Sequence, residues 1–298
     1  ESETIQLVIN RLYPNFFTNK SGVKYFLTIL GDHILKKKHN HIFIIPQHAK
    51  EFISSLDNTT RLLFNNIFLN TIFKYKYSDH NFKECRLLQI NKINMQYCDG
   101  FSEIILHLLC VACHYSIRYN TSDQYLSQCS NSSIVNYTLY IQRNSLVQIV
   151  SHFKKTFIQK PNVSIPEKLM FYLWKRYLKE KKLPAICTLS QQQMLFDQQF
   201  DFNKSNNEFE NITNLHLPIV DTFQDFWNQY IVIAPGYYHE FEIGELAQLF
   251  YFNTKQSMDE NLLLELVTHF YPNIIINEQK YIMNITSPLW NKYDDIIQ

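Results

Sequence analysis

Glycine is scarce in this sequence, with 5 glycines among 298 residues. Folds with many tight turns, and the glycine-rich loops that bind phosphates, need this residue at several positions, so we expect neither. No glycine precedes a lysine, which excludes a P-loop, and the motifs G-x-G-x-x-G, G-x-S-x-G and H-E-x-x-H do not occur. Because no catalytic motif is legible, we predict a non-enzymatic protein without a cofactor.

Cysteine and long apolar runs are also limited. The 6 cysteines are irregularly spaced over a large chain, whereas small secreted domains use cysteine far more densely. We therefore expect free thiols in a reducing compartment. No apolar run reaches the roughly 18 to 20 residues that a membrane span requires. These features predict a soluble, intracellular protein that makes no membrane contact.

Apolar and aromatic side chains, in contrast, are plentiful. Hydrophobic residues make up 46% of the chain and aromatic residues 15%, which is enough for a sizeable core. The net charge is only +1, but the charges are unevenly distributed. Residues 1–220 carry 25 Lys or Arg against 16 Asp or Glu, and residues 221–298 carry 3 against 11. The sequence thus predicts a basic body followed by an acidic C-terminal module.

The hydrophobic periodicity predicts a mainly α fold that is α+β overall. Apolar residues recur at helical spacing over 101–118, 144–157 and 166–182, and the runs HIFII (41–45) and CRLLQI (85–90) have the length of buried strands. We expect a basic, mostly helical body at residues 1–200, mixed α/β over 1–99 and helical over 100–200. The polar residues 201–217 are expected to form a linker or loop.

Residues 218–298 show the order helix, helix, hairpin. Two amphipathic segments, 239–255 and 257–272, are followed by alternating apolar and polar residues on both sides of a polar turn at 277–279. Ser257 and Glu260 have the spacing of a capping box for the second helix. This order is that of a winged-helix-like module. The alternative is a plain helical pair followed by an edge hairpin.

The module is acidic where a DNA-reading winged helix is usually basic. Its second helix contains no Lys or Arg, and its hairpin contains one lysine. An acidic surface repels phosphates, so we expect the module to dock a protein, either a basic partner or the basic body itself. The residues expected to form this docking surface are Glu242, Glu245, Asp259, Glu260 and Glu265.

The stretch LHLLCVACHYSIR (106–118) contains the pattern C-x-x-C-H, which occurs in haem attachment sites. On a helix, Glu103, His107, Cys110 and His114 would share one polar stripe opposite an apolar face. We interpret the segment as a structural helix and expect no metal. The alternative is a zinc site at Cys110 and His114, with further ligands from Cys98 or Cys129.

Basic residues gather on the helix predicted at 166–182, where they are interleaved with aromatic residues. Lysine and arginine can neutralise phosphates while aromatic rings stack on bases, which is how proteins hold single strands. The alternative is an ordinary solvated helix face. The residues predicted to bind nucleic acid are Lys168, Lys175, Arg176, Lys179, Lys182 and Trp174, with Lys36, Lys37 and Lys38 in a second patch.

Two phrases near the ends of the chain, YFLTILGDHILKK (25–37) and KYIMNITSPLWNKYDDI (280–296), resemble uncharacterised proteins of giant DNA viruses of the mimivirus type. The first is also similar to the helix and strand that lead into the ATPase core of viral primase-helicases. Where that family continues with a P-loop, this chain has IFIIPQHAKEF. The resemblance therefore implies no nucleotide site and no catalytic residue. It implies a location in the host cytoplasm, in a viral factory.

These observations predict a viral accessory factor for nucleic-acid processing, in replication, transcription or translation. It would bind nucleic acid through its basic helices and protein through its acidic module. Two alternatives stay open: a protein-interaction scaffold subunit of a viral complex, and an inactivated helicase-like ATPase or enzyme fragment.

Overall fold

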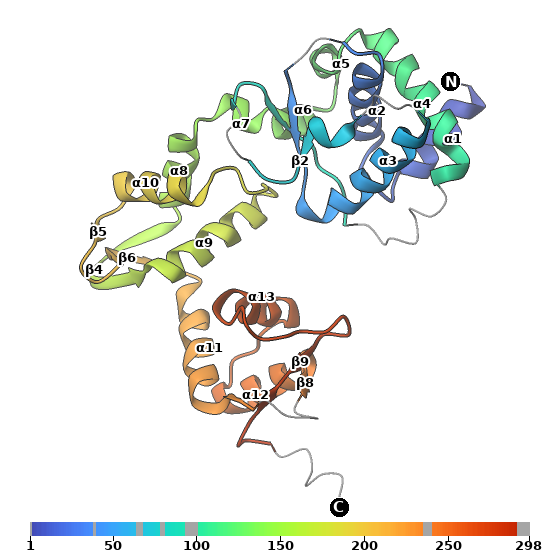
Figure 1. The fold of residues 1–298 in the computed structure, drawn as a ribbon. Helices are drawn as coiled ribbons and strands as arrows, with labels where there is room; N and C mark the ends of the chain where they lie inside the picture. Colours follow the sequence, from blue (N-terminus) through green and yellow to red (C-terminus); the bar gives the residue numbers. More distant parts are fainter. Residues whose placement is uncertain are drawn as a thin grey trace, which may run out of the picture. The chain divides into compact units, whose positions relative to one another are not determined.

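The computed structural model describes residues 2–37, 40–63, 68–77, 81–92, 101–234 and 240–290. Within these ranges the chain forms thirteen α-helices and ten short strands (Figure 1), which confirms the prediction of a mainly helical, α+β protein. The chain divides into two compact units. The first comprises Glu1–Lys155 and Trp174–Phe202, and the second comprises Thr156–Leu173 and Asn203–Gln298.

The first unit is mostly helical and contains one small sheet. Buried apolar side chains from its first four helices form one continuous core. In the described part of the chain, no helix is long and apolar enough to cross a bilayer. The helices are α1 (Glu3–Leu12), α2 (Lys20–Ile34), α3 (Lys50–Leu63), α4 (Phe101–Tyr119), α5 (Ser122–Gln128), α6 (Ser132–Thr138), α7 (Tyr140–Arg143), α8 (Leu146–Lys154), the C-terminal half of α9 (Glu167–Glu180), and α10 (Leu189–Gln199).

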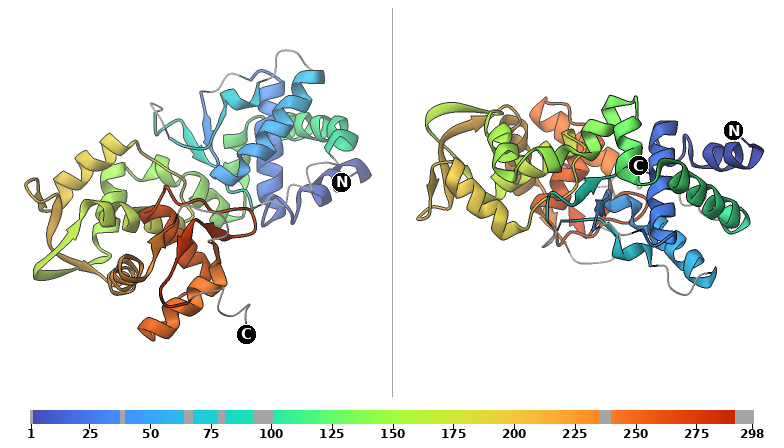
Figure 2. Two further views of the ribbon diagram at one scale, coloured as in Figure 1. Left: turned by 60° about the horizontal axis from the view of Figure 1, so that its bottom comes forward. Right: turned by 90° about the horizontal axis from the view of Figure 1, so that it is seen from above.

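Helix α2 forms the centre of this core, because all of its residues from 25 to 32 are buried. Gly31 marks the place where α2 crosses α4 most closely. A Cβ atom added to Gly31 would lie 2.1 Å from the backbone oxygen of Ala112. Protein interiors are close-packed and cannot absorb such an overlap, so this crossing requires glycine. The ribbon shows the two helices packed side by side (Figures 1 and 2).

A buried carboxylate fastens the same crossing. Asp32 is fully buried, and its Oδ1 accepts a hydrogen bond from the Ser116 hydroxyl at 2.6 Å while its Oδ2 accepts one from the Ser122 backbone N–H at 2.7 Å. The Lys37 ammonium lies 3.7 Å from Oδ1. A buried charge is tolerated only when it is paired and hydrogen-bonded, and here both conditions are met. The network ties the end of α2 to α4 and α5.

The two runs expected to be buried strands form a parallel sheet. The strands β1 (Ile42–Ile44) and β3 (Cys85–Leu87) fall inside the predicted runs, and a further strand, β2 (Phe73–Lys74), joins them. The order is β2–β1–β3, and β1 is parallel to both neighbours. Helix α2 packs on this sheet, since the ring of Tyr25 lies 6.4 Å from that of Phe43 and the ring of Phe26 lies 6.0 Å from that of Phe73.

The expected linker at residues 201–217 is instead part of a sheet, so that prediction is wrong. The strands β4 (Phe157–Pro166), β6 (Glu208–Asn214) and β5 (Phe202–Asn203) form a sheet in the order β4–β6–β5. Asn211 has a φ of 59°, which shifts the alternation of buried and exposed residues within β6 by one position. The amino-acid sequence therefore lacks the regular alternation that indicates a strand. The expected division near residue 200 also differs from the compact units, because Thr156–Leu173 belongs with the C-terminal part.

The C-terminal part of the second unit follows the predicted order of helices and hairpin. Strand β8 pairs antiparallel with β9, and Ile276 pairs with Ile282 around the predicted turn. The predicted capping box is wrong: Asp259 rather than Ser257 caps α13, and its carboxylate accepts the N–H of Asn261 at 2.9 Å. The elements are α11 (Leu217–Tyr230), β7 (Val232–Ile233), β8 (Glu240–Glu242), α12 (Ile243–Thr254), α13 (Glu260–Phe270), β9 (Tyr281–Met283) and β10 (Ile285–Thr286).

The close crossing of α2 and α4 predicts that Gly31→Ala lowers the free energy of unfolding of the first unit by about 3 kcal/mol or more, because the new Cβ meets a backbone oxygen. Gly22→Ala in the same helix is the matched control. Its Cβ would meet nothing closer than 3.4 Å, so we expect a gain of up to about 1 kcal/mol. Denaturant unfolding checks both variants, and wild-type stability of Gly31→Ala would contradict the crossing.

Candidate functional site

The parallel sheet brings two loops to one edge of the first unit. Because parallel strands end at the same edge, the segments that follow β1 and β3 leave the sheet together. In open α/β sheets, this carboxyl edge is where ligands bind. A groove of about 620 Å³ lies here, lined by residues that follow β1, residues that follow β3, and residues of α9 and the loop after it. The volume falls within the range of small-ligand sites.

Four lysines line this groove, which we call the lysine groove: Lys92, Lys175, Lys179 and Lys182. All four are exposed. Lys175 and Lys179 are four residues apart on α9, so they lie on the same face of the helix. Among the described residues that line the groove, none is Asp or Glu. Four ammonium groups at one groove attract anions and raise their local concentration.

His48 joins the two loops at the edge of the sheet. Its Nε2 donates a hydrogen bond to the carbonyl oxygen of Ile90 at 2.8 Å, and both residues line the groove. The chain after β1 passes through Pro46 into a short 3-10 turn, Gln47–Ala49, that runs directly into α3. The positive end of this helix dipole therefore adds to the charge of the lysines at the groove.

Tyr137 holds the loop that carries Lys182. Its hydroxyl donates a hydrogen bond to the carbonyl oxygen of Lys182 at 2.8 Å, and the backbone N–H of Tyr77 donates one to Ala185 at 2.8 Å. Burial raises the pKa of Tyr137 well above its usual value, so the phenol stays protonated and can donate. Lys182 itself has a φ of 57°, a conformation that these contacts must maintain.

Three of the residues predicted on the helix at 166–182, Lys175, Lys179 and Lys182, line the lysine groove, and the others have different contacts. Arg176 pairs with Glu180 on the same helix, with Nε 3.1 Å from Oε1. Lys168 belongs to the second unit, where its ammonium donates to the carbonyl oxygen of Phe270 at 2.8 Å.

The prediction that Trp174 stacks on bases is wrong. Its side chain is 2% exposed, and its ring lies 5.1 Å from that of Phe153 and 5.7 Å from that of Phe196. Helix α9 is amphipathic, and its large aromatic residues point into the core while its lysines point outward. Basic and aromatic residues that alternate along the sequence therefore lie on two different faces of α9.

In the second predicted patch, the contacts of Lys37 do not support a role in binding nucleic acid. Its ammonium donates to the carbonyl oxygens of Ser116 and Asn120 and neutralises Asp32, so it serves the fold of the first unit. Lys36 is exposed, and Lys38 lies outside the described residues. The run of three lysines in the sequence gave no sign that a buried carboxylate lies beneath one of them.

Helix α4 has the two faces that the sequence predicts. Cys110 and His114 are exposed, as are Glu103 and His107. Within the described ranges, no three His, Cys, Asp or Glu side chains are grouped closely enough to hold a metal ion. Cys98, proposed as a further zinc ligand, lies outside the described residues, so the zinc alternative gains no support. The buried face includes the predicted residues Ile105, Leu108, Val111, Ala112 and Tyr115.

The acidic residues of the second unit serve local structure as well as the surface. The Glu245 carboxylate accepts the backbone N–H of Glu242 at 2.9 Å at the start of α12, and Asp259 caps α13. Glu260 is exposed and Glu265 is half-buried. Their role in docking stays a prediction.

Three residues of the lysine groove were missed by the sequence analysis: His48, Lys92 and Tyr137. The first two follow the predicted strands, and the rule that ligands bind at the carboxyl edge of parallel strands could have found them. For Tyr137 the sequence contains no comparable signal, because its role depends on a hydrogen bond to a residue 45 positions away.

No protein-family model matches this chain, and neither a curated protein nor a solved structure is significantly similar to it. The function must therefore be inferred from the site itself, because a fold alone does not define one. The described residues define a mainly helical protein with a lysine groove at the carboxyl edge of a parallel sheet.

The hydrogen bond of Tyr137 predicts that Tyr137→Phe lowers the free energy of unfolding by about 1 kcal/mol at neutral pH. A phenol with a raised folded-state pKa contributes stability below about pH 10, its ordinary pKa, and this contribution is lost as the pH rises further. The variant should therefore lose stability less steeply above pH 10, by about 1.4 kcal/mol per pH unit.

Denaturant unfolding at several pH values measures this difference between the variant and the wild type. Tyr251→Phe, at an exposed tyrosine of the second unit, is the control and should leave the stability at neutral pH unchanged. Equal alkaline slopes for Tyr137→Phe and wild type would contradict the role assigned to this phenol.

Proposed function

We propose that the protein is a non-enzymatic accessory factor that binds the phosphate backbone of a nucleic acid in the lysine groove. The observation that carries this proposal is the convergence of Lys92, Lys175, Lys179 and Lys182 on one groove from two distant parts of the chain. Each lysine that contacts a phosphate releases condensed counterions, and this release supplies most of the affinity of non-specific binding.

The size and lining of the groove favour a single strand. Its volume of about 620 Å³ is that of a pocket for a small ligand, so it accommodates a short stretch of one strand more readily than a duplex. Trp174 is buried and takes no part in stacking. Four lysines and one tyrosine, Tyr137, line the groove, so binding should depend on charge more than on stacking, with steep salt dependence and little sequence preference.

The composition of the groove favours binding over phosphoryl transfer. Metal-dependent nucleases and polymerases hold their divalent ions with carboxylates. The described residues that line the lysine groove include no Asp or Glu, whereas four ammonium groups are present. This composition supports a holding role at this site.

A second function, protein docking, is proposed for the second unit. Its elements run in the order α11, β8, α12, α13, hairpin, with β9 paired to β8 and Ile282 paired to Ile276. This order supports a winged-helix-like module, and the acidic residues at the starts of α12 and α13 favour a basic protein over nucleic acid. The setting in a viral factory stays a prediction.

The lysine groove predicts that Lys175→Glu combined with Lys179→Glu weakens the binding of an oligothymidylate by at least about tenfold at low salt. The slope of the logarithm of affinity against that of salt concentration should flatten by about 1.4, since two contacts to a single strand are lost. Fluorescence anisotropy at several salt concentrations measures both quantities.

Lys20→Glu combined with Lys155→Glu is the matched control, because these exposed lysines of the first unit change the net charge equally but do not line the groove. The control should keep most of the affinity. Equal losses in the two double variants would show that net charge alone acts, and an unchanged affinity in the groove variant would refute the proposal.

A further inference from the structure

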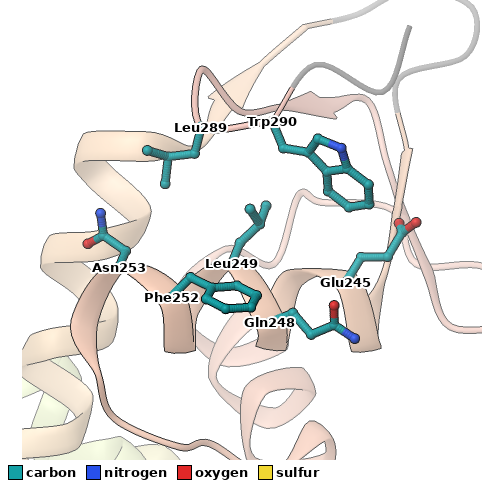
Figure 3. Close-up of a pocket in the computed structure, with 7 residues that line it drawn as sticks. All are labelled: Glu245, Gln248, Leu249, Phe252, Asn253, Leu289 and Trp290. Atoms are coloured by element: carbon teal, nitrogen blue, oxygen red, sulfur yellow. The ribbon is translucent and has the colours of Figure 1, made fainter. Parts of the chain in front are cut away.

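A second groove, of about 430 Å³, lies on the second unit between α12 and the segment after β10 (Figure 3). Helix α12 contributes Glu245, Gln248, Leu249 and Phe252, which are spaced i, i+3, i+4 and i+7 and so form one stripe along the helix. Leu289 and Trp290 lie on the opposite side. We call this feature the α12 groove.

The middle of the α12 groove is apolar and open to solvent. Phe252 is 65% exposed and Leu289 is 42% exposed. Figure 3 shows Leu249 rising from α12 between these two residues and Trp290. Clustered exposed apolar side chains mark an interaction site, because their burial against a partner removes apolar surface from water.

The charge around the α12 groove changes along the helix. Glu242 and Glu245 lie at its N-terminal end, and Ile243–Thr254 contains no Lys or Arg. Lys255 lies at the C-terminal end of the helix. Lys280 lies beside the N-terminal end, where its carbonyl oxygen accepts the N–H of Ile243 at 3.2 Å, so two carboxylates face one ammonium group there. An occupant with Lys or Arg at the end that meets Glu242 and Glu245 would complement this gradient. Nucleic-acid phosphates and anionic lipid headgroups would be repelled there.

We propose that the α12 groove docks a short amphipathic segment of a partner protein, with apolar anchor residues in the groove and Lys or Arg beside Glu242 and Glu245. This inference rests on the proposed docking function of the second unit and adds the site and the chemistry of the partner. The mode is that of an amphipathic helix laid in an apolar groove, where anchors at i and i+3 or i+4 fill the middle and charge fixes the direction.

The probe for this inference is a fluorescein-labelled helical peptide of about 12 residues, with leucines at i, i+3 and i+7 and lysines clustered near one end. Anisotropy with the full chain should show saturable binding. Phe252→Ala should weaken it by about tenfold, because the exposed anchor contact is lost. Glu245→Gln, which keeps a hydrogen-bond acceptor for Glu242 but removes the charge, should weaken it several-fold and reduce its salt dependence.

Two matched controls lie in the same unit but outside the groove. Ile275→Ala removes an exposed apolar side chain, and Glu278→Gln removes an exposed charge. Both should bind the peptide like the wild type. A peptide with its lysines replaced by glutamates should not bind.

Trp290 reports the location of binding. The chain has 3 tryptophans, and Trp174 and Trp227 are almost fully buried, whereas Trp290 is half-buried in the groove. Saturating peptide should therefore shield the fluorescence of Trp290 from acrylamide, and Phe252→Ala should abolish this protection at the same peptide concentration.

The outcomes separate this inference from the docking function on which it rests. If Asp259→Asn with Glu260→Gln weakens peptide binding while Phe252→Ala does not, the acidic surface docks protein but the α12 groove is not the site. If the peptide does not bind at all, both proposals fail. If Phe252→Ala instead abolishes a concentration-dependent self-association, the occupant is a second copy of this chain and the proposed partner is wrong.

Discussion

Gly31 lets the backbone of α2 approach that of α4 so closely that one added Cβ atom would lie 2.1 Å from a carbonyl oxygen. One residue further on, Asp32 is held by Ser116, Ser122 and Lys37. The same helix packs on the parallel sheet through its aromatic side chains. Since β1 is the central strand, the position of its carboxyl edge follows from this packing. The lysine groove lies at that edge, so it depends on a contact that no groove residue makes.

Helix α9 explains why lysines, and not Trp174, line the groove. One face buries Trp174 among aromatic side chains, and an adjacent face presents Lys175 and Lys179 to the groove. Four lysines line this groove, and a polyanion that binds them gains counterion-release free energy. A ligand that binds the folded groove more tightly than the unfolded chain should also stabilise the first unit.

Much of the fold could be predicted from the sequence, because amphipathic periodicity is a local property. It located α4 with both of its faces, the strands β1 and β3, and the helices and hairpin of the second unit. It failed at residues 201–217, where Asn211 breaks the strand alternation within a polar stretch. The charge pattern selected Lys175, Lys179 and Lys182, which line the lysine groove. Lys37 and Trp174 were wrongly placed on a binding surface, because the residues they contact are distant in sequence. His48 and Tyr137 were missed for the same reason, since a hydrogen bond across the fold leaves no local pattern.

Lysine footprinting can show whether the lysine groove contacts a nucleic-acid backbone. The unmodified chain is acetylated with limiting reagent, with and without a bound oligothymidylate, and the rate at each lysine is measured by mass spectrometry. We expect selective protection of Lys92, Lys175, Lys179 and Lys182, while Lys20 and Lys155 react at unchanged rates. Uniform protection of all exposed lysines, or protection confined to lysines outside the groove, would contradict it.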